Sequence, residues 1–346
     1  MSTTALSGSA NATKDAASDA TASVVPAIEF RDVSKVFEGN DSPAIDDLSL
    51  CINHGELVTF VGPSGCGKTT TLRLINRLIE PTTGTIHIEG RDVSMVPVEE
   101  LRRDIGYVIQ QVGLFPHRTV AQNIATVPKL LGWSKTDITA RVEELVDLVG
   151  LDRAILGRHP AALSGGQQQR VGVARALAAR PSVLLMDEPY SAVDPVVRAH
   201  LQDELLALHH RVGTTIVLVT HDIDEAVRLG DRVAVFAVGG RLAQFATPDE
   251  LMASPADEFV VSFLGPDRQL RRLALRHLGD LPLTEPSPDL DTAIADGSAV
   301  VLDATATGRN AVDAMLASGH RTVAVRSDGA ITGSITLDEL ARLLET

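Results

Sequence analysis

The hydrophobic pattern alternates between short, continuous apolar runs and longer segments whose apolar residues recur three or four positions apart. Runs at 57–61, 182–187 and 214–220 are typical of strands buried on both faces of a parallel sheet. Periodic segments at 68–79 and 197–210 follow the first two runs and predict helices that pack one face on that sheet. The alternation therefore predicts an α/β domain built on a parallel sheet.

The pattern changes in three other regions. Between 120 and 151 only helical periodicity remains, so we expect an all-helical subdomain at about 111–170. Residues 1–25 are rich in Ser, Thr and Ala, and we expect them to be disordered. Near the C-terminus the pattern reads strand, helix, strand, strand, helix, which predicts a small α+β module at 298–346 after a linker at 266–297.

Composition narrows the class of protein. The net charge of −14 argues against sequence-independent binding of nucleic acid. The only cysteines, Cys51 and Cys66, are too few for a disulfide scaffold and indicate a reducing compartment. No apolar run approaches the roughly 18 residues that a membrane-spanning helix needs, and no secretory signal is expected.

A glycine-rich segment joins the run 57–61 to the following helix. Its spacing fits the phosphate-binding loop G-x-x-x-x-G-K-[ST], in which backbone N–H groups and a helix N-terminus hold a polyphosphate. Lys68 would reach the β and γ phosphates and the Thr69 hydroxyl would ligate Mg²⁺. A glycine-rich turn without a ligand is the alternative. The candidate ATP-binding residues are Gly62, Pro63, Ser64, Gly65, Cys66, Gly67, Lys68, Thr69 and Thr70.

Polar residues stand where other buried strands end. Asp187 and Glu188 end the strand 182–187, Gln110 ends a shorter strand at 105–109, and His221 follows 214–220. One acidic residue could be a solvated strand end, and a lone histidine is usually structural. Two carboxylates beside a nucleotide loop favour Mg²⁺ and the activation of water.

Two further sites keep alternatives open. Ser164 is a plausible N-cap, and the glycines after it let a helix start approach a ligand closely, or merely make it flexible. Phe37 could stack on adenine or be a half-buried strand aromatic.

Taken together, these motifs resemble the ATP-binding subunit of ABC transporters over residues 28–263. The resemblance implies a P-loop NTPase fold at 26–265, with a RecA-like parallel-sheet core, a β subdomain and a helical subdomain. The motifs occur in the family's order: Gly62–Thr69 (Walker A), Gln110 (Q-loop), Leu163–Gln167 (signature), Asp187–Glu188 (Walker B), Asp194 (D-loop) and His221 (switch histidine).

The resemblance also implies roles for these residues in ATP hydrolysis. Two chains would form a head-to-tail homodimer around two ATP molecules, each held by Walker A of one chain and by Ser164, Gly165, Gly166 and Gln167 of the other, with Asp194 alongside. Glu188 would be the general base or orient water, with His221, Gln110 and Lys68 as the other catalytic residues. Thr69, Gln110 and Asp187 would hold Mg²⁺.

Segments 105–117, 127–133 and 263–268 resemble those of ATP-binding subunits from importers of glycine betaine, carnitine, choline or proline betaine. This implies a transmembrane permease partner, an indirect extracytoplasmic substrate-binding protein, and a peripheral place on the cytoplasmic face of the inner membrane. An importer for an amino acid or polyamine, a soluble ABC ATPase and a regulatory ATP-binding module are the alternatives.

The C-terminal module resembles a CBS domain, of which we find only one unit. Glu339 stands where such modules prefer Asp for ribose, so sensing of an adenosine ligand is not expected. Upstream, Arg268, Arg271, Arg272 and Arg276 recur at roughly helical spacing. That spacing favours a solvated helix face over contact with anionic lipid.

Overall fold

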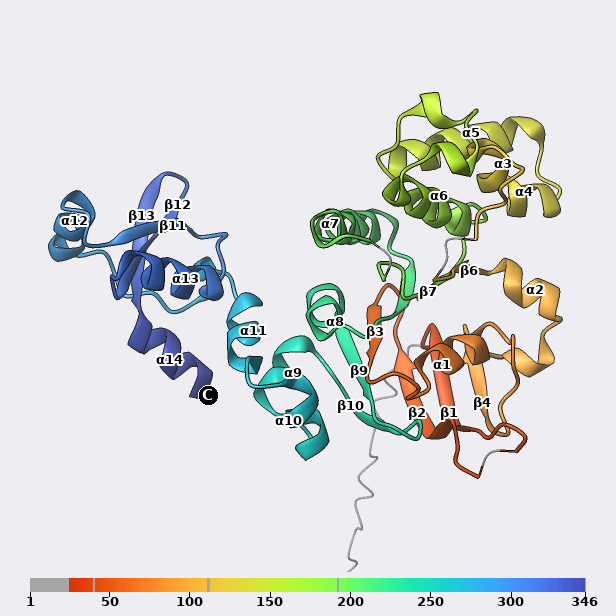
Figure 1. The fold of residues 1–346 in the computed structure, drawn as a ribbon, viewed down its shortest axis with the longest axis horizontal. Helices are drawn as coiled ribbons and strands as arrows, with labels where there is room; N and C mark the ends of the chain where they lie inside the picture. The colour runs from red at the N-terminus through yellow and green to blue at the C-terminus, as the bar shows by residue number, and fades with distance from the viewer. Residues whose placement is uncertain (1–24, 40, 111–112, 192, 346) are drawn as a thin grey trace, which may run out of the picture.

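The computed structural model describes residues 25–39, 41–110, 113–191 and 193–345. The segment predicted to be disordered, 1–25, lies outside the described residues except for Val25. A large α/β body carries a helical subdomain on one side, and a smaller C-terminal module stands apart from it (Figure 1).

The large body is built on a six-stranded sheet in the order β10-β9-β3-β8-β7-β6. All neighbours pair in parallel except β10, which runs antiparallel to β9. Every residue of the three central strands is buried, as their continuous apolar runs predict. The strands are β3 (Leu57–Val61), β6 (Ile105–Val108), β7 (Val183–Asp187), β8 (Thr215–Val219), β9 (Arg232–Phe236) and β10 (Leu242–Ala246).

The register of this sheet decides where the functional residues meet. Val219 of β8 lies opposite both Phe60 of β3 and Asp187 of β7, so these parallel strands end level with one another. The loops that follow them therefore emerge at one edge.

Helices cover the faces of this sheet. They are α1 (Lys68–Ile75), α7 (Pro195–Val212) and α8 (Ile223–Leu229). Helix α1 ends four residues before the predicted end at 79, because Asn76 is its C-cap and Arg77 takes a left-handed φ of 47°. Leu78 is consequently exposed rather than part of the packed face.

A second sheet, with the order β2-β1-β4-β5, is antiparallel and forms the β subdomain. Phe30, Leu48 and Ile86 from this sheet share one core with Leu72 of α1. That shared core fixes the position of the phosphate loop's helix. The elements are β1 (Ile28–Lys35), β2 (Ile45–Ile52), β4 (Thr83–Ile88), β5 (Arg91–Asp92) and α2 (Val98–Arg103).

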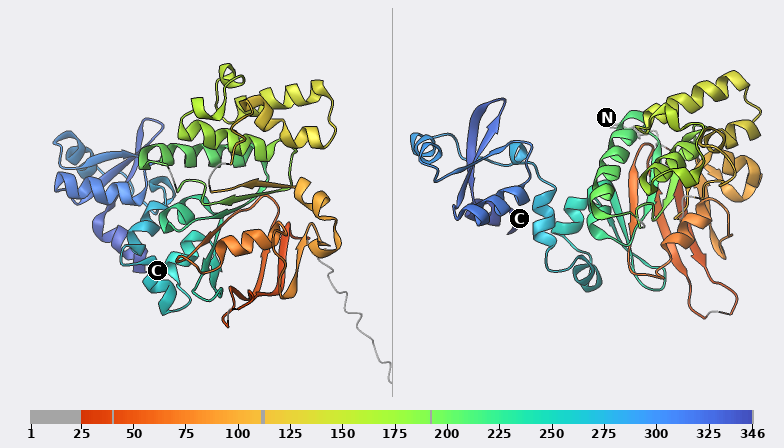
Figure 2. Two further views of the ribbon diagram at one scale, coloured as in Figure 1. Left: turned by 45° about the vertical axis from the view of Figure 1, so that its right-hand side comes forward. Right: turned by 45° about the horizontal axis from the view of Figure 1, so that its top comes forward.

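The helical subdomain comprises α3 (Val120–Ile124), α4 (Thr126–Leu130), α5 (Lys135–Leu148) and α6 (Gly165–Leu177). The predicted stripe on α5 is confirmed: Val142, Leu145 and Val146 are buried with Val171 of α6. Arg141 adds a polar link, because its buried guanidinium donates to the carbonyl oxygens of Leu177 and Ala178. Figure 2 shows this subdomain stacked against α7 at the edge of the large body.

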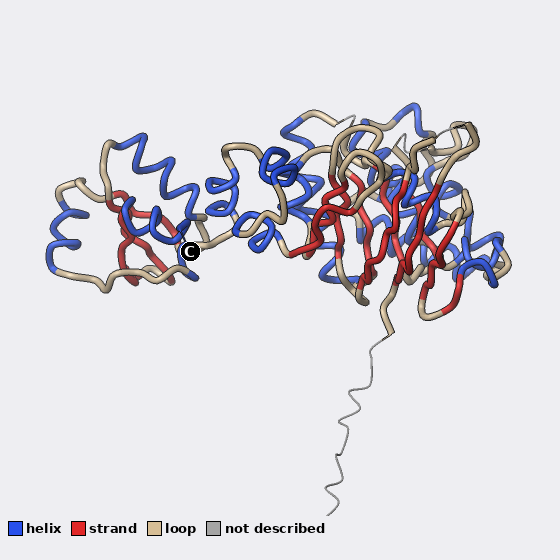
Figure 3. Tube along the Cα trace, turned by 90° about the horizontal axis from the view of Figure 1, so that it is seen from below, coloured by secondary structure: helices blue, strands red, loops and turns tan. Residues whose placement is uncertain are grey.

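The C-terminal module holds a three-stranded sheet, in which β11 pairs with β12 in parallel and β12 with β13 antiparallel. The predicted order of elements is confirmed, whereas its identity as a CBS domain stays a prediction. Figure 3 shows this sheet well separated from the others. The elements are β11 (Val300–Asp303), α13 (Gly308–Ser318), β12 (Thr322–Ser327), β13 (Ala330–Thr336) and α14 (Leu337–Glu345).

The segment predicted to be a linker, 266–297, contains two helices and packs on the module. It contains α11 (Arg268–Ala274) and α12 (Pro288–Ala295), and Thr284 forms a β-bridge with Ser334 of β13. Leu290 of α12 packs on Ala324 of β12, and so covers one face of the module's sheet. These residues are structural parts of the module because they bury apolar side chains against it.

Helix α11 connects the two parts, following α9 (Pro248–Ala253) and α10 (Glu258–Leu264). Its Arg272 is buried, with 5% of the residue exposed, and its Nε lies 3.0 Å from Oδ1 of Asp249 on α9. Arg276 makes a second ion pair with Asp249, and Arg271 one with Asp224 on α8. Our interpretation of these arginines as a solvated face was wrong, since acidic side chains of the large body hold three of them.

Candidate active site

The loop after β3 adopts the conformation that its glycines permit. Gly62, Gly65 and Gly67 have φ values of 153°, 78° and 100°. A Cβ on Gly62 would lie 2.3 Å from the carbonyl oxygen of Phe236, and one on Gly67 would lie 2.4 Å from that of Ala44. Only glycine fits at these two positions. Gly67 is the N-cap of α1 and offers no side-chain cap, so the N–H groups of the helix start stay available to a ligand.

Lys68 is held inside this loop. Its ammonium group donates to the carbonyl oxygens of Gly62, at 2.7 Å, and Pro63, at 3.0 Å, and lies 3.5 Å from Sγ of Cys66. Lys68 has only 6% of its surface exposed, so the loop keeps a buried positive charge. Cys66 is fully buried, and burial raises the pKa of its thiol. The sulfur therefore serves as a small apolar filler of the loop.

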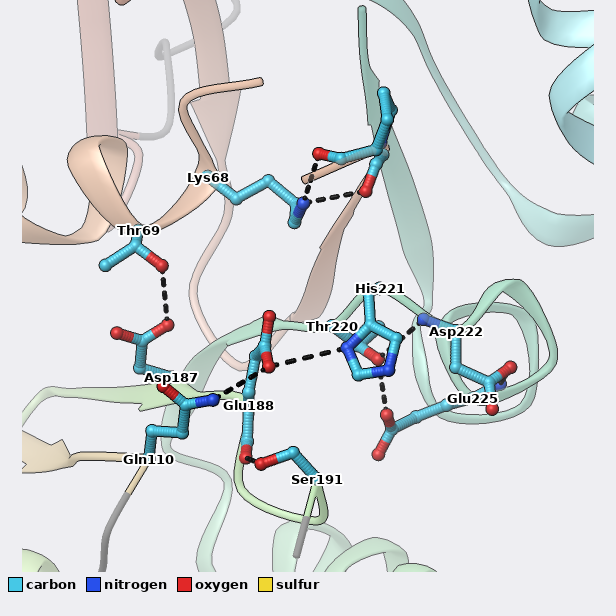
Figure 4. A network of polar contacts seen from close by, with 12 residues as sticks. Lys68, Thr69, Gln110, Asp187, Glu188, Ser191, Thr220, His221, Asp222 and Glu225 are labelled. Atoms are coloured by element: carbon cyan, nitrogen blue, oxygen red, sulfur yellow. Dashed lines mark hydrogen bonds and ion pairs between the residues drawn. The ribbon is translucent and has the colours of Figure 1, made fainter. Parts of the chain in front are cut away.

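Thr69 and Asp187 form the oxygen-rich part of the site. The Thr69 hydroxyl donates to Oδ1 of Asp187 at 2.9 Å (Figure 4). Burial raises the pKa of Asp187; the Thr69 hydrogen bond opposes that effect, and the charge of Glu188 adds to it. A buried carboxylate beside a hydroxyl is the kind of oxygen-donor set that Mg²⁺ takes, and a bound cation would favour the charged form of Asp187. These residues therefore fit the predicted metal.

Glu188 lies at the centre of a polar network drawn from three strand ends. Its Oε2 accepts from Nε2 of Gln110, which follows β6, at 3.1 Å, and lies 3.4 Å from Nδ1 of His221, which follows β8 (Figure 4). Glu188 has a left-handed φ of 45°, and its N–H donates to the carbonyl oxygen of Val219. That backbone position turns the side chain away from the buried strand, and the side chain is 22% exposed. The structure thus assembles three of the four predicted catalytic residues around one carboxylate.

The backbone around His221 is held by residues that we did not predict from the sequence. Buried Glu225 on α8 accepts from the Thr220 hydroxyl at 2.5 Å and from Nε2 of Gln202 at 3.3 Å. Thr220 Oγ1 in turn accepts the Asp222 N–H at 3.0 Å. The bonds on either side fix the backbone of His221, whose own side chain remains 57% exposed. The only signal in the sequence that could have indicated Glu225 is its position on the buried face of a helix that begins directly after a strand end.

The remaining predicted residues do not join this network. Ser164 caps α6 in a reciprocal capping box with Gln167, and it is exposed. Asp194 caps α7, accepting from the N–H groups of Val196 and Val197. Among the described residues, no hydrogen bond or ion pair links Ser164–Gln167 to the phosphate loop of the same chain. Phe37 lies beyond the end of β1, 38% exposed, with Lys35 Nζ 5.2 Å from its ring centre.

No helix in the described part of the chain is both long and apolar enough to cross a membrane.

Comparison with known proteins gives consistent results. A family model described as ABC transporter matches residues 45–191. The osmoprotectant import ATP-binding protein OsmV of Salmonella typhimurium is 52% identical over 264 residues, which are 75% of this chain and 69% of that protein. The glycine betaine uptake system ATP-binding protein YehX of Escherichia coli is 45% identical over 315 residues, or 90% of this chain and 98% of the relative.

A solved structure agrees with these relatives. The ATP-binding cassette MJ0796, described as a dimer in a post-hydrolysis state bound to ADP and phosphate, is 33% identical. It superposes with a TM-score of 0.57 over 64% of this chain and 98% of its own. The predicted P-loop fold of the large body is confirmed. The site geometry and the relatives agree, and the chain belongs to the family of ABC transporter ATP-binding proteins.

Proposed function

We propose that this chain is the ATP-hydrolysing subunit of an importer for quaternary-ammonium osmoprotectants such as glycine betaine, carnitine, choline or proline betaine. The observation that carries the hydrolytic part is the Glu188 carboxylate, held by Gln110 and His221 at the edge where the phosphate loop emerges. The solute class is supported by the relatives, two of which are described as import or uptake proteins for osmoprotectant or glycine betaine.

Glu188 carries out the central step. Its carboxylate accepts a hydrogen bond from water and orients that water, or takes its proton, for attack on the terminal phosphate of ATP. Gln110 and His221 fix the direction of the carboxylate, because both contact the same Oε2. Lys68 and the loop N–H groups stabilise the negative charge of the transferred phosphoryl group.

Mg²⁺ would be held by Thr69 and Asp187, with Gln110 at the same edge. When bound, the cation neutralises phosphate charge during the transfer. The hydroxyl of Thr69 already contacts the Asp187 carboxylate, so this chain presents the two oxygen ligands as a pair.

A homodimer would complete the site. Ser164 and Gly165 are exposed, and within the described residues they make no hydrogen bond with the phosphate loop of their own chain. The capping box of the signature helix uses the N–H groups of Ser164 and Gln167, whereas those of Gly165 and Gly166 make no hydrogen bond within the described residues. We infer that these two N–H groups bind the ATP held by a second copy. Phosphate release then weakens the dimer, because the γ-phosphate bridges the two surfaces.

A permease would dock beside the Q-loop at the cytoplasmic face of the membrane. Downstream of Gln110, the chain exposes apolar side chains, among them Phe115 at 37% and Leu130 at 74%. Asn123 stiffens this surface by exchanging hydrogen bonds with the backbone of Phe115. An extracytoplasmic substrate-binding protein would act through that permease alone.

Uptake measurements test the solute. A strain that lacks this subunit should lose uptake of radiolabelled glycine betaine or choline and regain it with the wild-type gene but not with Glu188→Gln. Loss of amino-acid or polyamine uptake with normal betaine and choline uptake would contradict the proposed solute. Co-purification with ribosomes rather than with a membrane protein would contradict a role in transport.

A further inference from the structure

A set of buried polar side chains lies next to the catalytic site, between α7 and α8. Thr220 follows β8, Gln202 lies on α7 and Glu225 lies on α8, and all three are buried. Figure 4 shows Thr220 beside His221, with its hydroxyl directed toward Glu225. Burial of three polar side chains is costly unless they are bonded to one another, so their hydrogen bonds show what the set holds in place.

Glu225 accepts at both of its carboxylate oxygens. The Thr220 hydroxyl donates to Oε2 at 2.5 Å, and Nε2 of Gln202 donates to Oε1 at 3.3 Å. Burial raises the pKa of Glu225, and these two hydrogen bonds oppose that effect. The contacts therefore suit a carboxylate, because an amide in its place would put a donor where the carboxylate now accepts.

Gln202 is fixed in the orientation that serves Glu225. Its Oε1 accepts from Nη1 of Arg228 at 3.1 Å, and Nη2 of the same guanidinium donates to Asp203 at 2.7 Å. A flipped amide would place its N–H groups against the guanidinium, which has only donors. Arg228 therefore keeps Nε2 of Gln202 directed toward Glu225.

Thr220 transmits this arrangement to the backbone around His221. Its Oγ1 accepts the Asp222 N–H at 3.0 Å, and the Asp222 carboxylate caps the first turn of α8. A threonine hydroxyl has a single proton, so its bond to Glu225 leaves the lone pairs of Oγ1 for the Asp222 N–H. His221 lies between these two fixed residues.

The ring of His221 has little else to fix its direction. Its Nδ1 lies 3.4 Å from Oε2 of Glu188, and the described part of the chain offers this exposed side chain no other hydrogen bond or ion pair. The direction of the ring toward Glu188 therefore depends on the backbone at 220–222. A displacement of about 1 Å at a catalytic site can cost about 10²-fold in rate.

A purely structural role for Glu225 would be to hold α8 on the sheet, and another residue already does so. Thr59 of β3 is fully buried, and its hydroxyl donates to the carbonyl oxygen of Ala226 on α8 at 3.0 Å. Thr59 is not part of the hydrogen-bonded set around Glu225. It therefore provides a matched control for Thr220.

We propose that Glu225 is a positioning residue for ATP hydrolysis, which acts through Thr220 to direct His221 toward Glu188. It contributes to kcat and not to the affinity for ATP, because neither Glu225 nor Thr220 belongs to the phosphate loop. This inference rests on the proposed function, in which His221 fixes the direction of the Glu188 carboxylate.

Threonine substitutions in the purified full chain test this role. Thr220→Val keeps the shape of the side chain but loses the hydroxyl, so kcat should fall about 10- to 100-fold while KM for ATP changes less than about twofold. Thr220→Ser keeps the hydroxyl and should retain kcat within about threefold of the wild type. Thr59→Val, the control, should leave kcat within about twofold. Equal losses of kcat in Thr59→Val and Thr220→Val would overturn the proposal, because anchoring of α8 would then explain both.

Glu225→Gln tests the carboxylate itself and does not depend on how well Thr220→Val folds. Its amide N–H group must face Gln202 or Thr220, so kcat should again fall by about tenfold or more. An unchanged kcat in this variant would overturn the role of Glu225.

A double substitution tests whether the effect passes through His221. Adding Thr220→Val to His221→Ala should lower kcat by less than about a further twofold, because the ring that Thr220 directs is already absent. Full multiplication of the two losses would show that Thr220 acts by another route, which contradicts the proposal.

The position of the ring can also be followed without hydrolysis. The imidazole NMR signal of His221, identified by its absence in His221→Ala, should shift or broaden in Thr220→Val and in Glu225→Gln but not in Thr59→Val. An unchanged signal in the first two variants would overturn the inference. A wild-type chain that hydrolyses no ATP would instead contradict the proposed function, while the NMR signal would still decide whether Glu225 positions His221.

Discussion

The six-stranded sheet and the C-terminal sheet use acidic residues in different ways. At the edge of the first, Glu188 is contacted by Gln110 and His221, which follow two other strands. In the second, Glu339 closes a capping box with Thr336 at the start of α14 and accepts from Thr284, which is bridged to β13. The Glu188 carboxylate is thus contacted by side chains at the surface of the site, whereas the Glu339 carboxylate accepts hydrogen bonds that stabilise its own module.

This contrast indicates where the chemistry of the molecule lies. Both carboxylate oxygens of Glu339 accept hydrogen bonds from its own module. Burial raises the pKa of Glu339, but the hydrogen bonds from Thr336 and Thr284 outweigh burial and hold that pKa below its usual value. Our expectation that the module does not sense an adenosine ligand stays a prediction.

The largest effect should come from substitution of Glu188, with Glu339 as the matched control. Glu188→Gln keeps the shape but removes the group that orients or deprotonates water, so kcat for ATP should fall by roughly 10²- to 10⁴-fold. Phosphate release measures the rate, and gel filtration with ATP should show an accumulated dimer. Glu339→Gln, the same change in the other sheet, should leave kcat within about twofold. Unchanged hydrolysis in the first variant would remove Glu188 from its role.

A second comparison uses two glycines with positive φ. Gly67 has φ 100° and no room for a Cβ, whereas Gly319, the C-cap of α13, has φ 76° and nothing within 4 Å. Gly319→Ala should cost about 1 kcal/mol of unfolding free energy, for the left-handed backbone alone. Gly67→Ala adds a clash with the Ala44 carbonyl, so we expect a loss of about 2–4 kcal/mol and of ATP binding.

Urea unfolding and nucleotide titration measure these two effects. Equal losses of stability in the two variants would show that the phosphate loop relaxes around an added methyl group. The crowding at Gly67 would then contribute nothing to the shape of the site.

A smaller effect is expected for the ion pairs of the C-terminal part. Arg272 is buried beside Asp249, and Arg272→Met should cost about 2 kcal/mol and open the α9–α11 contact, although Arg276 still pairs with Asp249. Arg321 and Asp338 are 70% and 72% exposed, so Arg321→Met should cost less than about 0.5 kcal/mol. Thermal melting and the rate of limited proteolysis within 265–277 distinguish Arg272→Met from Arg321→Met. Equal melting temperatures and equal cleavage rates in the two variants would show that α11 is not held by its arginines.

The smallest effect concerns pH. Although burial opposes them, hydrogen bonds from Arg272 and Arg276 hold the pKa of Asp249 below its usual value of 3.8. The native state therefore binds this proton less tightly than the unfolded state does. The stabilisation is fully present above the unfolded pKa and is lost as the pH falls below about 4 toward the folded pKa. Asp249→Asn should flatten the fall in melting temperature over that window. An identical pH profile in the variant would exclude Asp249 as a contributor.

The sequence was most informative where a motif and a strand end coincide. Asp187 ends a continuous apolar run and Glu188 follows it, while the phosphate loop joins another such run to Lys68. Parallel strands also end at a common edge. The proximity of Gln110 and Glu188, 78 positions apart, followed from that rule rather than from any local pattern. The contact between Gln110 and Glu188 was therefore predictable.

Long-range docking was not predictable in the same way. Arg271 and Asp224 are 47 positions apart on two helices whose contact depends on how α9 and α10 turn the chain back. The segment 266–297 was predicted to be only a linker, because a single sequence does not reveal that Leu290 and Thr284 have partners on a sheet formed later in the chain. Glu225 was missed for a related reason, since its burial depends on packing against Gln202 of α7.

Helix α11 belongs to both halves of the protein at once. Its Arg272 faces Asp249 of the large body, while Leu273, the next residue, lies in the apolar core of the C-terminal module against Gly308. A gene fusion that exchanges the module with a junction inside α11 would separate Arg272, which contacts the large body, from Leu273, which packs in the module. A transplanted module must therefore bring α11 with it and find a host whose α9 carries an acid at the matching position.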